Sequence, residues 1–314
     1  MSTLREASEQ YLRLRHELGY KLREPAGLLR NFVAFAEREG ADHVSTDLAL
    51  RWAQQPQGAQ PATWAGRLGV VRRFAVWLRA KDRRTEVPPA GLLPCRYRRK
   101  RPYLYSDKEI ENIVRAAGRL PSAAGLKGRT FATIFGLLAV TGLRVSEALA
   151  LDRQDVDLEE GVLRIRRTKF GKSRLVAVHE STREALADYA RQRDRVVQRP
   201  ATAAFFLSER GRRVTEWATR YNFAKVSREV GLRAVTTNCR HGRGPRLHDM
   251  RHRFAICTLL GWYRAGIEVE REIPKLATYL GHVHVNETYW YLEAVPELLE
   301  LAMRRLESPR GAKP

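Results

Sequence analysis

The chain has 314 residues, of which 44% are hydrophobic and 29% are charged, and this composition excludes an intrinsically disordered protein. Lys and Arg number 57 against 35 Asp and Glu, so the formal charge of +22 predicts a polyanionic partner such as nucleic acid, although an Arg-rich solvated surface is the alternative. Three scattered cysteines argue against a disulfide framework, and the lack of a bilayer-length apolar run or a signal-peptide pattern predicts a cytoplasmic protein.

Residues 1–84 are predicted to form a helical domain with helices near 4–18, 28–36, 47–54 and 62–81. Thr3 and Glu6 form a capping box for the first helix, and Thr46 is predicted to cap the third. The fourth helix has one apolar side, and its other side is basic: Arg67, Arg72, Arg73 and Arg79. This face is either simply solvated or a surface that lies against DNA phosphates.

Residues 85–104 are predicted to be a linker, because prolines and a glycine interrupt the helical periodicity. The end of the segment is crowded with positive charge: Arg96, Arg98, Arg99, Lys100 and Arg101. It is either a solvated tether or a basic strap along DNA that joins two halves of a clamp. Residues 105–314 then form the second predicted domain.

The second domain begins with a capping box, Ser106 with Glu109, followed by an apolar helix over 131–140 that Gly142 closes. The next helix, predicted over 143–151, places Arg144 in its first turn, between apolar stretches. A nearly buried arginine needs an anion. Glu147 can supply that anion from the protein, and a bound phosphate is the alternative.

Alternating apolar and basic residues at 162–166 and 175–178 predict a β-hairpin with Lys169 at its basic tip. Ser181 with Glu184 is predicted to cap the following helix, and another helix begins near Thr215. Residues 233–246 then form a basic loop, with Arg240 and Arg243 as candidate contacts to a polyanion.

His248 and Arg251 are three residues apart at the start of a helix that Asp249 can cap, so they share one face. A zinc site is a possible second use of this region, but the spacing fits no standard ligand pattern: Cys239, His241, His248 and His252. A Leu-Gly-His turn at 280–282 ends one helix, and Asn286 is predicted to cap a helix that carries Tyr289 and Tyr291. The last helix, 297–306, has an apolar stripe that must dock on its own body or on a neighbour.

These motifs, in this order, resemble the tyrosine recombinases of the lambda-integrase and Xer-like family. The resemblance covers roughly residues 102–306, and the first domain and linker fit the family's core-binding domain more loosely. Each motif alone recurs by chance, whereas the set is specific. The segments that carry it are Thr-Gly-Leu-Arg-Val-Ser-Glu (141–147), Thr-Lys-Phe-Gly-Lys-Ser-Arg (168–174), Leu-His-Asp-Met-Arg-His-Arg-Phe-Ala (247–255) and Leu-Gly-His (280–282) with Tyr291 nine residues later.

The resemblance implies a mainly α protein with a small antiparallel β-sheet. It also implies a two-domain C-shaped clamp, in which a helical core-binding domain precedes a mixed α+β catalytic domain. Its active-site positions fall on six residues: Arg144, Lys169, His248, Arg251, His282 and Tyr291. Helix geometry leaves Tyr289 and Tyr291 open as the nucleophile, because they point in different directions, and the family's spacing from His282 selects Tyr291.

The implied reaction cuts and rejoins DNA through a 3′-phosphotyrosyl link, with no metal, ATP or other cofactor. Physical chemistry fits these roles, since guanidinium forks match phosphate oxygens and a phenol with a pKa of about 10 needs nearby cations and a base. The implied partners are double-stranded DNA with an inverted-repeat core site and a homotetramer that exchanges C-terminal helices. The run at 289–299 is more similar to recombinases of mobile elements than to chromosome-dimer resolvases.

Two alternatives remain open at this level. A type IB topoisomerase shares the nucleophile and the clamp and relaxes supercoils as a monomer. A non-catalytic relative would bind DNA as an accessory subunit, although the intact set of six residues argues against it.

Overall fold

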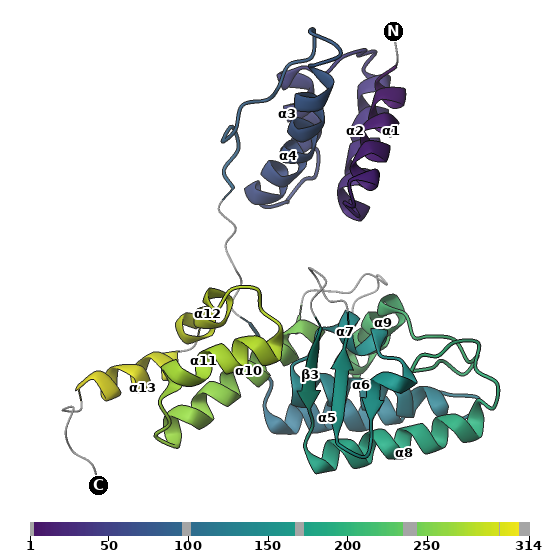
Figure 1. The fold of residues 1–314 in the computed structure, drawn as a ribbon, viewed down its shortest axis with the longest axis vertical. Coiled ribbons are helices and arrows are strands. Elements are labelled where there is room, and N and C mark those ends of the chain that lie inside the picture. The colour runs from purple at the N-terminus through teal and green to yellow at the C-terminus, as the bar shows by residue number, and fades with distance from the viewer. Residues whose placement is uncertain (1–2, 96–101, 167–172, 235–243, 295, 308–314) are drawn as a thin grey trace. The chain divides into compact units, whose positions relative to one another are not determined.

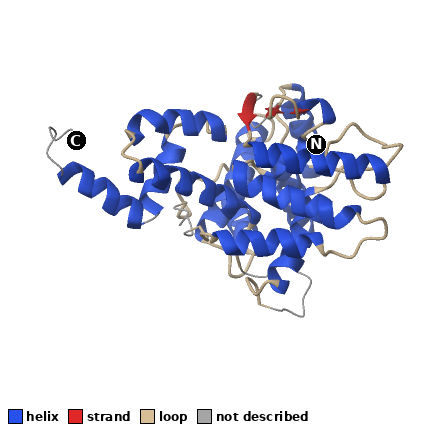
Figure 2. Cartoon of the chain, turned by 90° about the horizontal axis from the view of Figure 1, so that it is seen from below, coloured by secondary structure: helices blue, strands red, loops and turns tan. Residues whose placement is uncertain are grey.

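Helices make up most of the chain, as Figure 2 shows, and the sheet found in the described residues has three strands. The computed structural model describes residues 3–95, 102–166, 173–234, 244–294 and 296–307. The chain divides into two units, Met1–Lys100 and Arg101–Pro314. The predicted fold class, mainly α with a small antiparallel sheet in two domains, is confirmed.

The first unit contains α1 (Leu4–Glu17), α2 (Arg23–Arg38), α3 (Thr46–Gln54) and α4 (Pro61–Leu78) (Figure 1). Its core consists mainly of leucine, alanine and valine side chains, with aromatic rings among them, such as Phe32 and Trp52, which are in edge contact with ring centroids 5.3 Å apart. The predicted capping box at the start of α1 is confirmed. The predicted cap of α3 is wrong by one residue, because the hydroxyl of Ser45, not Thr46, accepts a hydrogen bond from the Leu48 amide at 3.2 Å.

The first part of the predicted linker packs on this same unit. Thr85 is buried, and Val87 and Leu93 lie against the core of the helices. The amide of Glu86 donates to the carbonyl of Val44 at 2.7 Å, which fastens the segment to the loop before α3. Residues 96–101, which include the predicted contacts Arg99, Lys100 and Arg101, lie outside the described residues.

The second unit is built around α6 (Leu126–Thr141), a largely apolar helix against which α5 (Asp107–Gly118), α8 (Glu180–Val196) and α10 (Leu247–Arg264) pack. Helix α6 begins earlier than the predicted residue 131, and it ends at Gly142 as predicted, with φ of +61°. The capping box of α5 is confirmed. The predicted cap of α8 is wrong, because His179 takes that position and its ring accepts from the Ser181 amide at 3.3 Å.

The sheet has the order β1-β2-β3 and is antiparallel throughout, with β1 (Val156–Asp157), β2 (Val162–Ile165) and β3 (Arg174–Ala177). The predicted hairpin corresponds to β2 and β3, and β1 was not predicted. The register pairs Ile165 with Arg174, so Arg174 is the first residue of β3. The tip of the hairpin, residues 167–172 with Lys169, lies outside the described residues.

A short helix, α7 (Val145–Ala150), follows α6 directly, and the 3₁₀ turn η1 (Arg153–Asp155) leads from it toward the sheet. The predicted position of Arg144 in the first turn of this helix is wrong. Arg144 is the N-cap, with extended backbone angles of φ −68° and ψ 145°, because the chain leaves the left-handed Gly142 before it can begin a new helix. The guanidinium therefore projects from the junction between two helices.

The remaining helices are α9 (Glu216–Glu229), α11 (Val269–Leu280), α12 (Asn286–Ala294) and α13 (Pro296–Glu307). Helices α10 to α13 share a second apolar cluster that includes the buried side chains of Tyr291 and Leu298. Asn286, predicted as a cap, is the first helical residue of α12. Each helix in the described part of the chain is too short or too polar to cross a membrane.

Candidate active site

The C-terminal end of α11 receives hydrogen bonds from three arginines that come from three different elements. Its last carbonyls lie at Tyr279, Leu280 and the following Gly281. Arg174 of β3 donates to the first at 2.7 Å, Arg251 of α10 to the second at 2.8 Å, and Arg144 to the third at 3.1 Å. A helix C-terminus offers unpaired carbonyls and partial negative charge, so cations bind there favourably.

One carboxylate connects two of these arginines. Glu147 in α7 accepts from Nη1 of Arg144 at 2.8 Å and from Nη1 and Nη2 of Arg174 at 3.1 and 2.8 Å. It also accepts from the backbone amide of Arg144 at 3.1 Å. Burial raises the pKa of Glu147, but Arg174 and Arg144 lower it more, so the net pKa lies below the ordinary value and the group is a carboxylate at neutral pH.

Arg251 is buried to 2% exposure, and its second hydrogen bond goes to the carbonyl of Gly142 at 2.8 Å. Burial and the charge of Arg144 lower the pKa of Arg251 to about 10. A cation with a lowered pKa gains stability from any added anion. Arg144 is the more accessible of the two, with 28% of its side chain exposed.

Tyr291 in α12 lies against this arginine group. Its side chain is buried to 2% exposure, and burial raises the pKa of its phenol, while the charge and hydrogen bonding of Arg251 and the charge of Arg144 act in the opposite direction. Tyr289, two residues earlier, is 41% exposed. The helix therefore directs one of its two tyrosines toward the arginines and the other toward solvent.

Two imidazoles, His252 and His282, contact the ring of Tyr291, and His248 contacts the first of them. The ring of His282 is stacked with that of Tyr291 at 6.2 Å, and its Nδ1 lies 2.7 Å from the hydroxyl of Thr288. The ring of His252 lies between those of His248, at 4.7 Å, and Tyr291, at 5.5 Å. Burial, with nearby arginine charge as a further cause, lowers the pKa of His248 to about 4 and that of His282 to about 3, so both are neutral at pH 7.

The structure thus brings five of the six predicted positions together, and the sixth, Lys169, lies outside the described residues. Sequence reasoning missed Arg174, His252 and Thr288 as neighbours of the site. Arg174 lies inside the matched segment 168–174, so its place in that segment was the available signal. Thr288 offered none, because a threonine in a helix is common.

The predicted DNA-binding arginines of α4 differ from one another. Arg67 donates to the carbonyl of Trp52 at 2.8 Å and stacks on its ring, and Arg72 donates to the carbonyl of Pro88 at 2.8 Å. Arg73 is exposed. Two of the four arginines predicted to face DNA on α4 therefore bind carbonyls of their own unit instead. The other predicted contacts, Arg240 and Arg243, lie outside the described residues.

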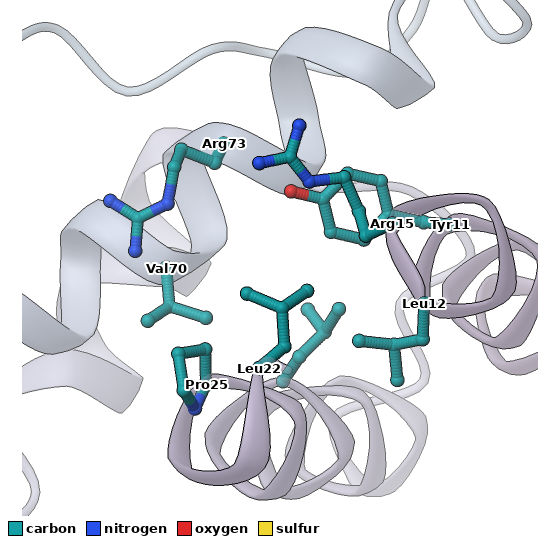
Figure 3. A pocket seen from close by; sticks show the side chains of 8 residues that line it. Tyr11, Leu12, Arg15, Leu22, Pro25, Val70 and Arg73 are labelled. Carbon is teal, nitrogen blue, oxygen red and sulfur yellow. The ribbon is translucent and has the colours of Figure 1, made fainter. Parts of the chain in front are cut away.

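A pocket in the first unit lies between α1, α2 and α4 (Figure 3). Its lining is mostly apolar, and the guanidinium groups of Arg15 and Arg73 lie at its rim. It brings together none of the predicted catalytic positions, which all belong to the second unit. We therefore assign no chemistry to it.

Metal-ligating side chains do not cluster anywhere in the described residues. Two members of the zinc alternative, Cys239 and His241, lie outside those residues. Cys95 and Cys257 are free and exposed thiols.

Comparisons with known proteins find integrases and recombinases, both by sequence and by structure. Residues 104–297 match the sequence profile of the phage integrase family. A Sinorhizobium fredii protein, y4rB, classed as a candidate integrase/recombinase, is 49% identical over 311 residues, which are 98% of this chain and 98% of y4rB. The tyrosine recombinase XerD of Ralstonia nicotianae is 28% identical over 267 residues, 84% of this chain and 79% of XerD. A solved structure of a lambda integrase dimer bound to a COC′ core site aligns with a TM-score of 0.63 at 17% identity, over 92% of this chain and 77% of that chain.

Proposed function

Because this chain belongs to the phage integrase family of tyrosine recombinases, we propose that it cuts and rejoins DNA through Tyr291. The observation that carries the proposal is the buried phenol of Tyr291 beside the guanidinium groups of Arg144 and Arg251. A phosphodiester is the DNA group that such an arrangement suits, because its two non-bridging oxygens share one negative charge.

The charge balance of the arginine cluster, defined as Arg144, Arg174 and Arg251, supports an anionic substrate. Three guanidinium groups are hydrogen-bonded there, and in the described residues Glu147 is the one carboxylate that hydrogen-bonds to them. Helix carbonyls offset part of the excess positive charge, with a partial charge of about −0.5 at a helix C-terminus. A bound phosphate supplies the remaining negative charge and lies within reach of Arg144, the most exposed member.

In the proposed step the phenolic oxygen of Tyr291 attacks phosphorus and the bond from phosphorus to the 5′ oxygen breaks. The products are a 3′-phosphotyrosyl link and a free 5′ hydroxyl. The phenol proton passes to a neutral imidazole, for which His252 and His282 are the candidates because their rings contact that of Tyr291. Lys169 gives a proton to the departing 5′ oxygen. The reverse attack by a 5′ hydroxyl reseals the strand without ATP, because the ester conserves the bond energy. Arginines neutralise the phosphate charge in this scheme, so it uses no metal ion.

The proposed partners are double-stranded DNA with an inverted-repeat core site and three further copies of the chain. Helix α13 supports the assembly, because Leu298 is buried while Leu299 and Met303 on the same helix are 46% and 59% exposed. An exposed apolar surface on a terminal helix suits a contact with a neighbouring subunit.

The direct test is covalent trapping on a nicked suicide substrate that loses its 5′ hydroxyl after cleavage. The wild-type protein is expected to leave a protein–DNA band in denaturing gels, and Tyr291→Phe is expected to leave none. Tyr289→Phe is the matched control and keeps the band, since its ring points to solvent. An adduct that persists in Tyr291→Phe and disappears in Tyr289→Phe would overturn the choice of nucleophile.

The same reagents separate the alternatives. A non-catalytic accessory subunit binds the substrate and forms no adduct. A topoisomerase of type IB relaxes plasmid that lacks a cognate site, acting as a monomer, whereas a recombinase requires its site and assembles on it. Arg144→Lys is expected to lose cleavage far more than DNA binding, because a point charge cannot replace a planar fork.

A further inference from the structure

Arg174 has no assigned role in the reaction, yet its side chain donates three hydrogen bonds within the arginine cluster. Its side chain is 10% exposed and lies at the start of β3, the strand that follows the hairpin tip. It forms a two-pronged pair with both oxygens of Glu147, at 3.1 and 2.8 Å, and donates from Nε to the carbonyl of Tyr279 at 2.7 Å. Such fork-shaped pairs fix geometry as well as charge.

Glu147 is shared in a way that leaves it little freedom. Each of its oxygens accepts one hydrogen bond from Arg174 and one from Arg144, the latter through the side chain at one oxygen and the backbone amide at the other. An ionised carboxylate has about four acceptor sites, so all are occupied. The orientation of the Arg144 guanidinium therefore depends on a carboxylate that Arg174 also holds.

Gly281 provides the space for this arrangement. Its φ is +71°, and a Cβ at this position would lie 2.6 Å from Nη1 and 2.9 Å from Cζ of Arg174. The guanidinium of Arg174 thus lies close against the turn whose carbonyl accepts a hydrogen bond from Nη2 of Arg144 at 3.1 Å. Arg144 and Arg174 therefore contact the same turn and the same carboxylate.

From these contacts we propose that Arg174 is a positioning residue, which holds Glu147 and the turn at Gly281 so that the guanidinium of Arg144 is fixed for a phosphate. It acts through Arg144 and does not itself contact the substrate. The inference deepens the proposed DNA cleavage and rests on it. Arg174 also connects β3, the strand that follows the predicted position of Lys169 in the chain, to the arginines proposed to hold the phosphate.

The first test compares Arg174→Lys with a matched control in the same unit. Arg193 is also buried, pairs with both oxygens of Asp194 at 2.8 and 3.1 Å and donates to the carbonyl of Phe205 at 2.9 Å. Both lysine variants lose a fork and a carbonyl contact, so both are expected to melt at a lower temperature. Arg174→Lys is expected to slow single-turnover cleavage by about tenfold or more with DNA affinity within about twofold, and Arg193→Lys to leave cleavage within about twofold.

A double-mutant comparison tests the route of action. If Arg174 acts through Arg144, then Arg174→Lys has little further effect on cleavage in an Arg144→Lys background. If the two substitutions instead slow cleavage independently, so that the fold-losses multiply in the double variant, the proposal is overturned. A cleavage loss in Arg193→Lys equal to that in Arg174→Lys would also overturn it, because the effect would then follow from general destabilisation.

A measurement that does not need cleavage separates this inference from the proposed function. The ¹⁵N–¹H signal of the Arg144 Nε group, assigned with the Arg144→Lys protein, is expected to report a rigid side chain in the wild type and in Arg193→Lys. In Arg174→Lys it is expected to shift and to show increased motion. An unchanged Arg144 signal in Arg174→Lys would overturn the positioning role, even if that variant cleaves slowly. A wild-type protein that forms no covalent adduct would overturn the proposed function, and the Arg144 signal would still decide whether Arg174 positions Arg144.

Discussion

Replacing Glu147 with glutamine tests how much the second unit depends on its buried carboxylate. The substitution keeps the shape of the side chain, removes the negative charge and turns one acceptor into a donor that faces guanidinium N–H groups. Two of the four hydrogen bonds to this carboxylate are lost, and two guanidinium groups lose their shared counter-ion. Breaking a buried ion pair by removing one partner costs about 3–5 kcal/mol, a large share of the ~5–15 kcal/mol that stabilises a domain.

Asp188 supplies a matched control, because it too pairs with two arginines, Arg129 and Arg191, each at 3.3 Å. Its side chain is 50% exposed, so solvent screens both pairs and Asp188→Asn is expected to cost no more than ~1 kcal/mol per pair. Each carboxylate pairs with two arginines, so a difference in stability loss between Glu147→Gln and Asp188→Asn reports the effect of burial and not the number of partners.

The assay is amide hydrogen exchange of α6, the central helix, since the chain has two units and a single melting temperature does not define the stability of one of them. Glu147→Gln is expected to lower the free energy of opening of α6 by about 3–5 kcal/mol at pH 7. The pKa of Glu147 is lowered from its ordinary 4.5, so its contribution is complete above pH 4.5 and is lost as pH falls through the folded value. Equal losses in Glu147→Gln and Asp188→Asn, or a gap between wild type and Glu147→Gln that stays constant below pH 4, would refute this reasoning.

The histidines and one glycine of the second unit give three more predictions. The folded-state pKa values of His248, His252 and His282 are about 4, 4 and 3 against an ordinary 6.5, so the unfolded chain binds more protons below pH 6.5 and the unit is expected to lose stability from pH 6.5 toward pH 4. Amide hydrogen exchange of α10 at pH 7 and pH 5 measures this, and an unchanged free energy of opening contradicts it. A bound phosphodiester raises these pKa values, so DNA binding at pH 5 is expected to be accompanied by proton uptake. Calorimetry in buffers of different ionisation enthalpy detects this uptake, and proton release would count against the placement of the phosphate. Gly142→Ala is expected to destabilise the protein by ~2 kcal/mol or more, because its φ is +61° and the new Cβ would lie 2.7 Å from a phenylalanine ring. The control Gly66→Ala in α4 has open space around the new Cβ and is expected to stabilise by roughly 0.5–1 kcal/mol, and chemical denaturation measures both.

The elements that local rules specify were predictable from the sequence. The capping boxes that begin α1 and α5 were found because hydroxyl and carboxylate groups three residues apart satisfy each other's backbone amides. The helix end at Gly142 was found because a left-handed residue at this position favours glycine. The β2–β3 hairpin followed from alternation, a signal with the period of a strand.

The errors arose where neighbouring residues could serve equally well. Ser45 and Thr46 both carry a hydroxyl, and the sequence does not distinguish them; in the structure Ser45 has the extended backbone of an N-cap, and Thr46 is the first helical residue. The cap of α8 was assigned to Ser181, but His179 holds that position, because an imidazole nitrogen can accept a hydrogen bond from a backbone amide as a hydroxyl does. The strand β1 is two residues long and is defined by its pairing with β2, so periodicity could not reveal it.

The candidate site shows a different limit of sequence reasoning. Its side chains were named from motif order, but the acceptors that bring them together are the carbonyls of Tyr279, Leu280 and Gly281. Every residue has a carbonyl, so no pattern of side chains marks these three. They are free because α11 ends there, and they lie close together because Gly281 turns the chain and has no Cβ where Arg174 must lie. The glycine of the Leu-Gly-His motif is therefore required for main-chain geometry that places two arginines, and a larger residue there would disturb Arg174 and Arg144 before it touched any nucleic acid.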